Sequence, residues 1–292
     1  MKLREFCTFC NKKSLKIKHD FGYYSVVECD SCGFLFRDRI LSHKEEEKLY
    51  DKNYYLKLQK EYFLNCLTPN PKDKSRIKDF ESRLDLLENL LKKGAAVNLL
   101  DIGAGTGVFG YLAQKRGWQT LNAEISAYAL NIAKSKFKVK TFRGEITDKK
   151  FTGGNYDLIT LWESIANIEN TPRLLRTIRK LLNNHGKVAI LTTVADSWLY
   201  DAANLIHKLS FSRIKYFVKE GFPIHHANHF TRAALKKALH KEGFKVIYQS
   251  NQEIPYKYTK LPKIFQPLLI ILGKLANIYG RTIQVLLIAQ KA

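Results

Sequence analysis

Acidic residues are scarce in this chain of 292 residues. Asp and Glu together number 27, against 49 Lys and Arg, which gives a net charge of +22. The imbalance is greatest in residues 201–292, where 15 basic residues face only 4 acidic ones. Such a surface attracts polyanions, either nucleic acid or anionic lipid, although a proteome rich in lysine would produce the same bias.

Other features are also missing from the sequence. No secretory apolar segment follows Met1, so we expect an intracellular, cytoplasmic protein. There is no internal repeat and no low-complexity segment. The apolar run Leu268–Leu272 is interrupted directly afterwards by Gly273 and Lys274, so it cannot span a bilayer. With a hydrophobic content of 45%, the chain suits one core with an appendage.

Cysteine is almost confined to the N-terminus, where four of the five in the chain occur within the first 40 residues. Cys7 and Cys10 form one C-x2-C pair, Cys29 and Cys32 form the second, and 18 residues separate the pairs. This spacing is typical of a four-cysteine zinc ribbon, in which two knuckles enclose the metal. Four protein ligands leave no open position, so we expect the Zn²⁺ to be structural.

The stretch Asn98–Gly110 reads N-L-L-D-I-G-A-G-T-G-V-F-G. An apolar run ends in Asp101, three alternate glycines follow, and the apolar pattern then resumes, which indicates a buried strand, a tight turn and a helix start. Glycines remove the Cβ atoms that would keep a ligand away from the backbone, so the turn can hold a ligand against the first amides of the helix. A nicotinamide dinucleotide and a turn without ligand are the alternatives.

This stretch resembles the first motif, D/E-x-G-x-G-x-G, of class I methyltransferases that depend on S-adenosylmethionine (SAM). The resemblance implies that Glu124, which ends the second predicted strand, binds the ribose hydroxyls, and that Glu145 lies near the adenine unless it is a surface carboxylate. It further implies that one group of residues cradles the amino acid part of SAM: Asp101, Gly103, Ala104, Gly105 and Gly107.

The sequence L-W-E-S-I-A-N-I after the fourth predicted strand resembles the family segment L-W-x-x-L-E-H. The resemblance implies that Trp162 borders the cofactor and that Glu163 is a catalytic base or substrate ligand; a capping or solvated carboxylate is the alternative. Ala166-Asn167 replaces the family's E-H pair, so a histidine base is not expected at that point.

Three histidines, His225, His226 and His229, lie in the segment H-H-A-N-H-F-T. In similar zinc-ribbon methyltransferases, an H-x-x-H-F-[ST] segment borders the substrate cleft. The resemblance therefore implies substrate contact or general-base catalysis, while structural hydrogen bonding and metal binding remain open.

The pattern of strands and helices predicts an α/β fold, a seven-stranded, mostly parallel, Rossmann-like methyltransferase sheet with helices on both faces. We expect a zinc ribbon over 1–40, a helical lead-in over 41–93 and the SAM-dependent core over 94–292. Ser42 is a predicted N-cap, and aromatic residues of the lead-in either help to cover the SAM pocket or only pack in the core. The predicted strands are 97–101, 119–124, 139–142, 156–161, 187–193, 244–248 and 283–289.

Two insertions are expected in this core, at about 196–222 and 256–278. Both combine apolar residues with lysines. The first is a candidate lid or membrane-facing helix. For the second, burial before the last strand and a position in the lipid interface are both compatible with the pattern.

Two absences narrow the reaction. The D/N-P-P-Y motif of exocyclic amino methyltransferases is missing, and no cysteine near strands four to six could support covalent pyrimidine C5 chemistry. We therefore predict O- or C-methylation of a small-molecule, saccharide-linked or lipid-linked acceptor, with the enzyme held at an anionic membrane surface. An RNA methyltransferase is the alternative, and a non-catalytic SAM-fold binding module is a second one. The oligomeric state is left open.

Overall fold

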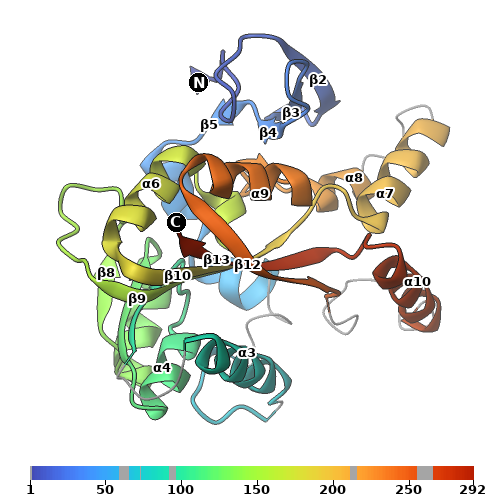
Figure 1. The fold of residues 1–292 in the computed structure, drawn as a ribbon. Coiled ribbons are helices and arrows are strands. Elements are labelled where there is room, and N and C mark those ends of the chain that lie inside the picture. Colours follow the sequence, from blue (N-terminus) through green and yellow to red (C-terminus); the bar gives the residue numbers. More distant parts are fainter. Residues whose placement is uncertain (1, 59–65, 73, 92–96, 211–215, 255–265) are drawn as a thin grey trace.

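A seven-stranded sheet forms the centre of the protein (Figure 1). The computed structural model describes residues 2–58, 66–72, 74–91, 97–210, 216–254 and 266–292. The strand order is β12-β13-β10-β9-β6-β7-β8. The strands are β6 (Asn98–Ile102), β7 (Gln119–Glu124), β8 (Thr141–Arg143), β9 (Tyr156–Trp162), β10 (Leu182–Thr193), β12 (Phe244–Gln252) and β13 (Gln284–Lys291).

All strand pairs are parallel except those of β13, which runs antiparallel to both of its neighbours. Ala289 of β13 is in register with Val188 of β10 on one side and with Val246 of β12 on the other. The predicted seven-stranded, mostly parallel sheet is therefore confirmed. Two strands are several residues longer than predicted, because β10 begins at Leu182 and β12 extends to Gln252, whereas the bounds of the other strands shift by at most two residues.

Both faces of the sheet are buried along β6, β9 and β13, which explains why these strands are mainly apolar. Leu99, Leu158 and Leu286 belong to one core cluster, whereas their neighbours Leu100, Ile159 and Leu287 belong to the other. On the first face lie α3 (Ser75–Leu91), α4 (Val108–Lys115), and α5 (Ala127–Ile132) with its continuation η3 (Ala133–Phe137); on the second lie α6 (Thr171–Leu181) and α9 (Arg232–Lys241).

Local capping chemistry sets the start of two helices. Ser42 caps α1 (His43–Leu49) through a capping box with Glu45, which confirms the predicted N-cap. Asn170 caps α6 and leaves Pro172 in its first turn, where the missing N–H carries no penalty. Two shorter elements, η1 (Tyr54–Leu58) and η4 (Ile165–Asn167), lie outside these helices.

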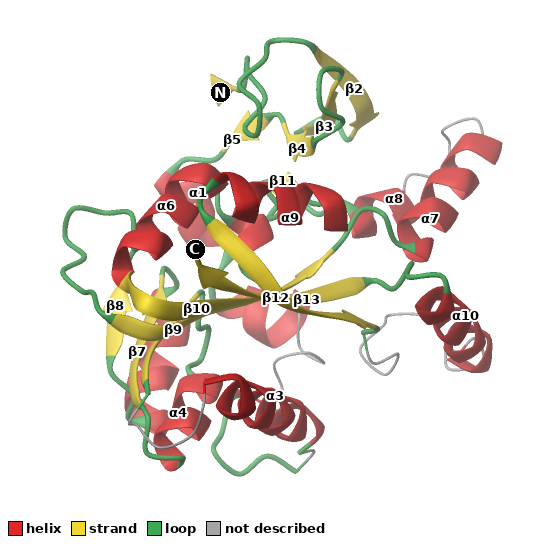
Figure 2. Cartoon of the chain, viewed as in Figure 1, coloured by secondary structure: helices red, strands yellow, loops and turns green. Residues whose placement is uncertain are grey.

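The N-terminal ribbon consists of β2 (Leu15–Asp20), β3 (Ser25–Cys29) and β4 (Leu35–Arg37), and a short strand from the other end of the chain completes its sheet. That strand, β11 (Asn228–His229), pairs antiparallel with β4. A separate pair joins β1 (Lys2–Leu3) to β5 (Arg39–Ile40). Figure 2 shows the ribbon seated above the helices of the second sheet face.

Side chains continue this connection between the ribbon and the core. The ring of Phe34 in the ribbon contacts the ring of Phe230, with a distance of 5.3 Å between the centroids. The ring of Phe9 lies 5.2 Å from that of Phe34. Phe34 and Phe36 belong to the same cluster as Leu100 and Ile159 of the sheet. The ribbon is therefore packed onto the sheet and its helices as part of one hydrophobic interior.

Of the two placements that its sequence allows, the second insertion does not take the buried one, because most of its described helix is exposed. Helix α10 (Gln266–Ile278) buries only Leu269, Gly273 and Ala276 on one side, while Leu268 is 53% exposed and Ile271 56%. The first insertion forms α7 (Trp198–Leu209) and α8 (Tyr216–Gly221). Residues 211–215 and 255–265 of these segments lie outside the described residues. Among the helices that the structure describes, none is both long and apolar enough to cross a bilayer.

Asn228 joins the ribbon to the core, and we expect its loss to destabilise the fold. Its side-chain amide donates to the Ile168 carbonyl at 2.7 Å and accepts from the Thr8 hydroxyl at 3.1 Å. Asn228→Ala leaves a buried carbonyl unpaired, so chemical denaturation should show a loss of about 2–3 kcal/mol in the free energy of unfolding. The exposed control Asn131→Ala should change it by less than about 0.5 kcal/mol. Equal values for both variants would contradict the bridging role.

Candidate active site

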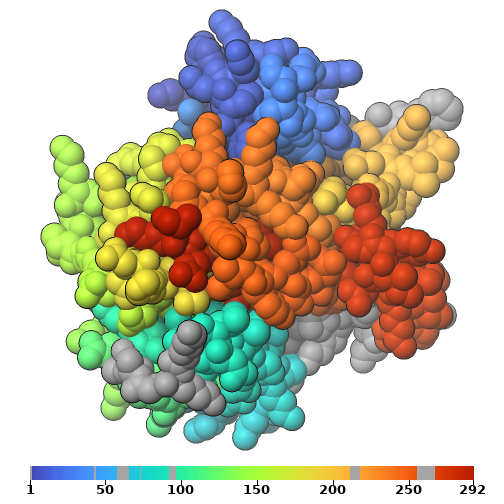
Figure 3. All heavy atoms as spheres, in the orientation of Figure 1, coloured from blue at the N-terminus to red at the C-terminus, as the bar shows by residue number. Residues whose placement is uncertain are grey.

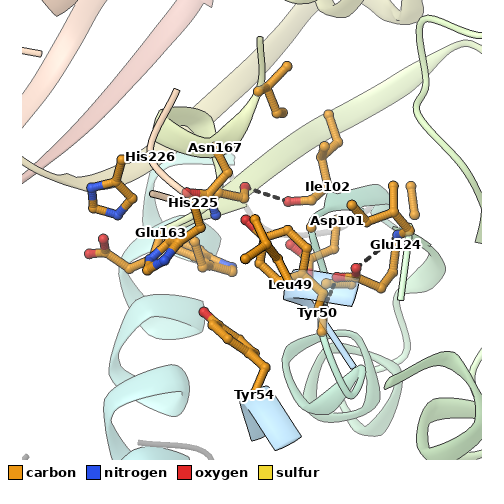
Figure 4. Close-up of a pocket in the computed structure, with 18 of the residues that line it drawn as sticks. Leu49, Tyr50, Tyr54, Asp101, Ile102, Glu124, Glu163, Asn167, His225 and His226 are labelled. Atoms are coloured by element: carbon orange, nitrogen blue, oxygen red, sulfur yellow. Dashed lines mark hydrogen bonds between the residues drawn. The ribbon is translucent and has the colours of Figure 1, made fainter. Parts of the chain in front are cut away.

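A cavity of about 400 Å³ opens at the carboxyl ends of β6, β7 and β9. Ligands of open α/β sheets bind at this edge, and the volume is within the range of small-molecule sites. Figure 4 shows Asp101 and Glu124 on one side, and Glu163, His225 and His226 on the other. The cavity therefore has two chemically different ends.

The turn after β6 forms one wall of this cavity. Gly103 and Gly105 have φ angles of 70° and 55°, in the left-handed region that favours glycine. A Cβ atom at Gly103 would lie 2.4 Å from the Cβ of Ser164, so no side chain fits there. The amide of Gly103 donates to the Ala123 carbonyl at 2.8 Å, which fixes the turn against β7.

Gly107 does not line the cavity, unlike Gly103 and Gly105. It precedes α4 in a left-handed conformation with φ 79°. A Cβ atom there would meet Val139 at 2.9 Å and Ala133 at 3.0 Å. Its glycine is explained by the close packing of this turn, whereas Ala104 lines the cavity as predicted.

Two buried carboxyl groups lie at the ends of adjacent strands. Asp101 accepts a hydrogen bond from Thr160 at 2.7 Å, and burial raises its pKa to about 7. Glu124 accepts from the backbone amides of Ile125 at 2.8 Å, Ser126 at 2.9 Å and Gly105 at 2.9 Å. Burial raises the pKa of Glu124 as well, and the three amides oppose this effect. The end of β7 is thereby tied to the glycine turn.

The two other predicted cofactor residues also line the cavity. Trp162, at the end of β9, is buried, and its ring centroid is 4.9 Å from that of Phe109. Glu145 is exposed and accepts a hydrogen bond from Thr147 at 2.9 Å, so it is a surface carboxylate at the rim of the cavity.

Glu163 lines the cavity in a strained backbone conformation, with φ 58°. Its side chain accepts hydrogen bonds from the amide of Gln284 and, at 3.3 Å, from the backbone N–H of Thr193. Burial raises its pKa. The side chain of Glu163 therefore connects the end of β9 to β10 and β13 at the point where the cavity opens.

The structure brings two of the three predicted histidines to the cavity. His225 and His226 line it, with ring centroids 4.7 Å apart, and Tyr54 contacts His225 at 5.9 Å. Burial lowers the pKa of His225 to about 4 and that of His226 well below its usual value, so both are neutral at pH 7. Their wall is therefore aromatic and uncharged.

His229, unlike the two other histidines, does not line the cavity. It lies in β11, and its ring packs against Phe222 with centroids 4.7 Å apart. Among the described residues, neither ring nitrogen has a hydrogen-bond partner. Its surroundings are those of a core side chain.

Several lining residues were not singled out from the sequence. Arg37 reaches the cavity from β4, where its guanidinium donates to the Ile224 carbonyl and to Glu169. No sequence signal distinguishes this arginine from the many others. The lead-in supplies Tyr50, Tyr54 and Tyr55 to the lining, as its aromatic composition suggested.

The lining includes polar atoms that are buried without a hydrogen-bond partner among the described residues. Among them are Nε1 of Trp162, Oδ1 of Asn167 and Nδ1 of His226. Buried polar groups in native proteins are nearly always hydrogen-bonded, so these atoms are suited to bind a ligand. They come from three different segments that converge on the same space.

The four ribbon cysteines come together in one cluster, as their spacing predicts, and this cluster could hold a metal ion. Their sulfur atoms all lie within 4.8 Å of one another, and the shortest separations are 3.7 Å for Cys7–Cys32 and 3.6 Å for Cys10–Cys29. Tetrahedral zinc with bonds of about 2.3 Å places its sulfurs about 3.8 Å apart, whereas a disulfide requires about 2.05 Å. Asn11 and Gly33, which follow the two pairs, have φ angles of 59° and 69° as each knuckle requires.

Sequence comparison identifies the family. A family model for a methyltransferase domain matches residues 65–249, which is more than half of the chain. The chain belongs to this methyltransferase family. The prediction of a class I SAM-dependent methyltransferase is therefore confirmed, and SAM is the cofactor that the glycine turn and its two acids would hold. No match was found among curated protein sequences.

Solved methyltransferase structures share the fold at low sequence identity. A SAM-dependent, possible histamine N-methyltransferase from Thermotoga maritima is 15% identical, with a TM-score of 0.52 over 82% of this methyltransferase and 98% of that chain. Geranyl diphosphate C-methyltransferase from Streptomyces coelicolor A3(2) is 14% identical, with a TM-score of 0.52 over 77% of this methyltransferase and 89% of that chain. Magnesium protoporphyrin IX methyltransferase from Synechocystis PCC 6803, which contains bound SAH, is 11% identical. Its TM-score is 0.53 over 85% of this methyltransferase and 100% of that chain.

The burial of His229 predicts an acid-dependent loss of stability. Burial lowers its pKa to about 3, so between pH 6.5 and 3 the unfolded chain binds a proton that the folded methyltransferase does not, and stability falls as the pH falls. His229→Phe keeps the ring packing and removes the titrating group. The difference in free energy of unfolding between the variant and the wild type should therefore be about 2 kcal/mol more favourable to the variant at pH 5 than at pH 7. Denaturant titrations at both pH values measure this, with the exposed His185→Phe as control. A pH-independent difference would contradict it.

Proposed function

We propose that the protein transfers the methyl group of SAM to a hydroxyl or an activated carbon of a small acceptor, either free or linked to a lipid or saccharide. The observation that carries this proposal is a single cavity with the SAM motif at one end and a neutral wall of histidine and tyrosine at the other. Methyl transfer is an in-line displacement, so it depends mainly on aligning two reactants in one desolvated space.

At the donor end, the glycine turn and the acids would hold the cofactor. Gly103 and Gly105 leave the backbone accessible, and Glu124 is positioned by three amides at the end of β7. When bound, SAM supplies an electrophilic methyl group on a sulfonium. The buried Asp101 and Glu124 favour a ligand with positive charge at this end.

At the acceptor end, His226 is the candidate proton acceptor. Its Nδ1 is buried without a partner among the described residues, and burial keeps the ring neutral. We infer that Nδ1 accepts the hydrogen bond of an acceptor hydroxyl and takes its proton as the oxygen–carbon bond forms. His225 and Tyr54 contact each other beside it and exclude water.

Glu163 fits a positioning role in this scheme. Both of its carboxylate oxygens are engaged, one by Gln284 and one by the Thr193 amide. Its strained φ of 58° fixes the chain between Trp162 and Ser164, both of which line the cavity. Substitution of Glu163 would therefore act on activity through the shape of the site.

We also propose that the ribbon cysteines bind one structural Zn²⁺. The four thiols provide a complete tetrahedral set with no position for substrate. The metal would hold the ribbon sheet, which β11 completes only two residues after His226. Through this connection, zinc would stabilise the acceptor wall without taking part in the reaction.

Two measurements test the methyltransferase proposal. Calorimetry should detect SAM binding tighter than about 1 mM, corresponding to about 4 kcal/mol. Radiolabelled SAM with a fractionated extract should then label an acceptor. His226→Gln should retain SAM affinity and lose about 10²- to 10⁴-fold in turnover, whereas the exposed control His240→Gln should lose neither.

Three results would contradict this scheme. Undetectable SAM binding would support a non-catalytic binding module. Labelled product that is destroyed by ribonuclease would support an RNA methyltransferase. Full turnover in His226→Gln would show that the reaction does not need His226 as a proton acceptor.

Removal of the metal should destabilise the protein. Metal analysis should find one zinc per chain, and Cys29→Ser should lose it and lower the melting temperature by roughly 10 °C, because metal binding contributes directly to folding. Cys66→Ala, which removes a buried thiol outside the cluster, should keep the zinc. A metal-free wild type with unchanged melting temperature would show that the cluster is not a zinc site.

A further inference from the structure

Helix α10 lies at the surface, and apart from Lys274 and Asn277 its described exposed side chains are apolar. Besides Leu268 and Ile271, its exposed side chains include Leu275 at 48% and Ile278 at 75%, and the next residue, Tyr279, is 77% exposed. Figure 3 shows this segment projecting at one edge of the molecule. Contiguous exposed apolar surface of this kind marks a site for a protein partner or a membrane.

Helix α7 extends the apolar surface. Leu205 and Leu209 are 56% and 70% exposed, and Ile206 is also exposed. The start of α7 is joined to the end of α10, because the Trp198 amide donates to the Arg281 carbonyl at 2.9 Å and Arg281 forms an ion pair with Asp201. Both helices lie on the same edge of the molecule in Figure 1.

The opposite side of α7 is fixed to the protein. Tyr200 and Ala203 pack in a cluster with Val26 and Leu35 of the ribbon. The amide oxygen Oδ1 of Asn204 accepts a hydrogen bond from Nε2 of His19 in β2 at 2.9 Å. The exposed leucines of α7 are thus presented outward by a helix whose other face is already occupied.

The charges on these two helices are nearly all positive. Lys208 and Lys274 are exposed, and Asp201, the one acid in residues 198–209 and 266–281, is already paired with Arg281. Apolar side chains combined with lysines are suited to an anionic lipid interface, where the chains enter the acyl boundary and the ammonium groups meet the headgroups. A symmetric contact between two copies would bring like charges together.

We propose that α7 and α10 form a docking face for an anionic lipid bilayer. With 13 residues, α10 lies in the interface and does not cross it. The same edge leads to the cavity, because Glu220 of α8 and Ile254, which follows β12, belong to its lining. Resting on the proposed function, this placement favours an acceptor whose apolar part remains in the bilayer while its reactive group enters the cavity.

Sedimentation of the full chain with vesicles tests the docking face. The protein should pellet with vesicles of equal parts phosphatidylcholine and phosphatidylglycerol, bind phosphatidylcholine alone about tenfold more weakly, and be released by salt. The double variant Leu268→Ser/Ile271→Ser should weaken binding by about tenfold or more, and Lys274→Glu should weaken it and reduce its dependence on salt.

The matched control is Ile17→Ser, which removes a side chain 62% exposed on β2 of the ribbon and should leave vesicle binding unchanged. Equal loss in this control, or no binding to anionic vesicles at low salt, would overturn the proposal. So would a dimer in sedimentation velocity that the double variant converts to a monomer, because the face would then join two copies. Calorimetry with SAM on every variant separates these outcomes from a failure of the methyltransferase assignment.

Discussion

The carboxylate of Glu124 holds together the two turns on which the cofactor end of the site depends. One of its oxygens accepts from the two amides that follow β7, and the other accepts from Gly105. This arrangement is possible only because the glycine turn passes close to β7 and β9, where the contact with Ser164 leaves no space for a side chain at Gly103. The cost of burying the carboxylate is offset by charge-assisted hydrogen bonds from rigid backbone donors.

The acceptor end depends on a different part of the chain. Arg37 from the ribbon, Tyr54 from the lead-in and His226 from the segment before β11 all reach the cavity. The core alone would leave this side open. The ribbon therefore contributes Arg37 to the cavity lining and pairs through β4 with β11, which closely follows His226 in the chain.

Much of the fold could be predicted from the sequence, because its signals are local. Glycine spacing defined the turn after β6, cysteine spacing defined the cluster, and Ser42 with Glu45 defined a helix start. Each depends on backbone conformation or ligand geometry within a few residues. Continuous apolar segments predicted the strands because both sheet faces are buried.

The remaining features depend on long-range contacts that no local pattern encodes. Arg37 is fully buried in a ribbon strand, and β11 has only two residues, so neither has a recognisable signature. The sequence pattern left two positions open for α10, because an apolar helix has the same composition in a core as at a surface. The core environment of His229 likewise has no local signature, because it depends on the pairing of β11 with β4.

The pairing of β11 with β4 also has a consequence for synthesis. Phe36 pairs with Asn228, so the ribbon sheet cannot be completed until nearly 200 further residues have been translated. At about 5–20 residues per second, this takes about 10–40 s, during which β4 presents an unpaired edge. An open edge of a β-sheet can pair with another chain. During this period the ribbon of the nascent protein is vulnerable to association with other chains. The period ends when Asn228 and His229 pair with β4.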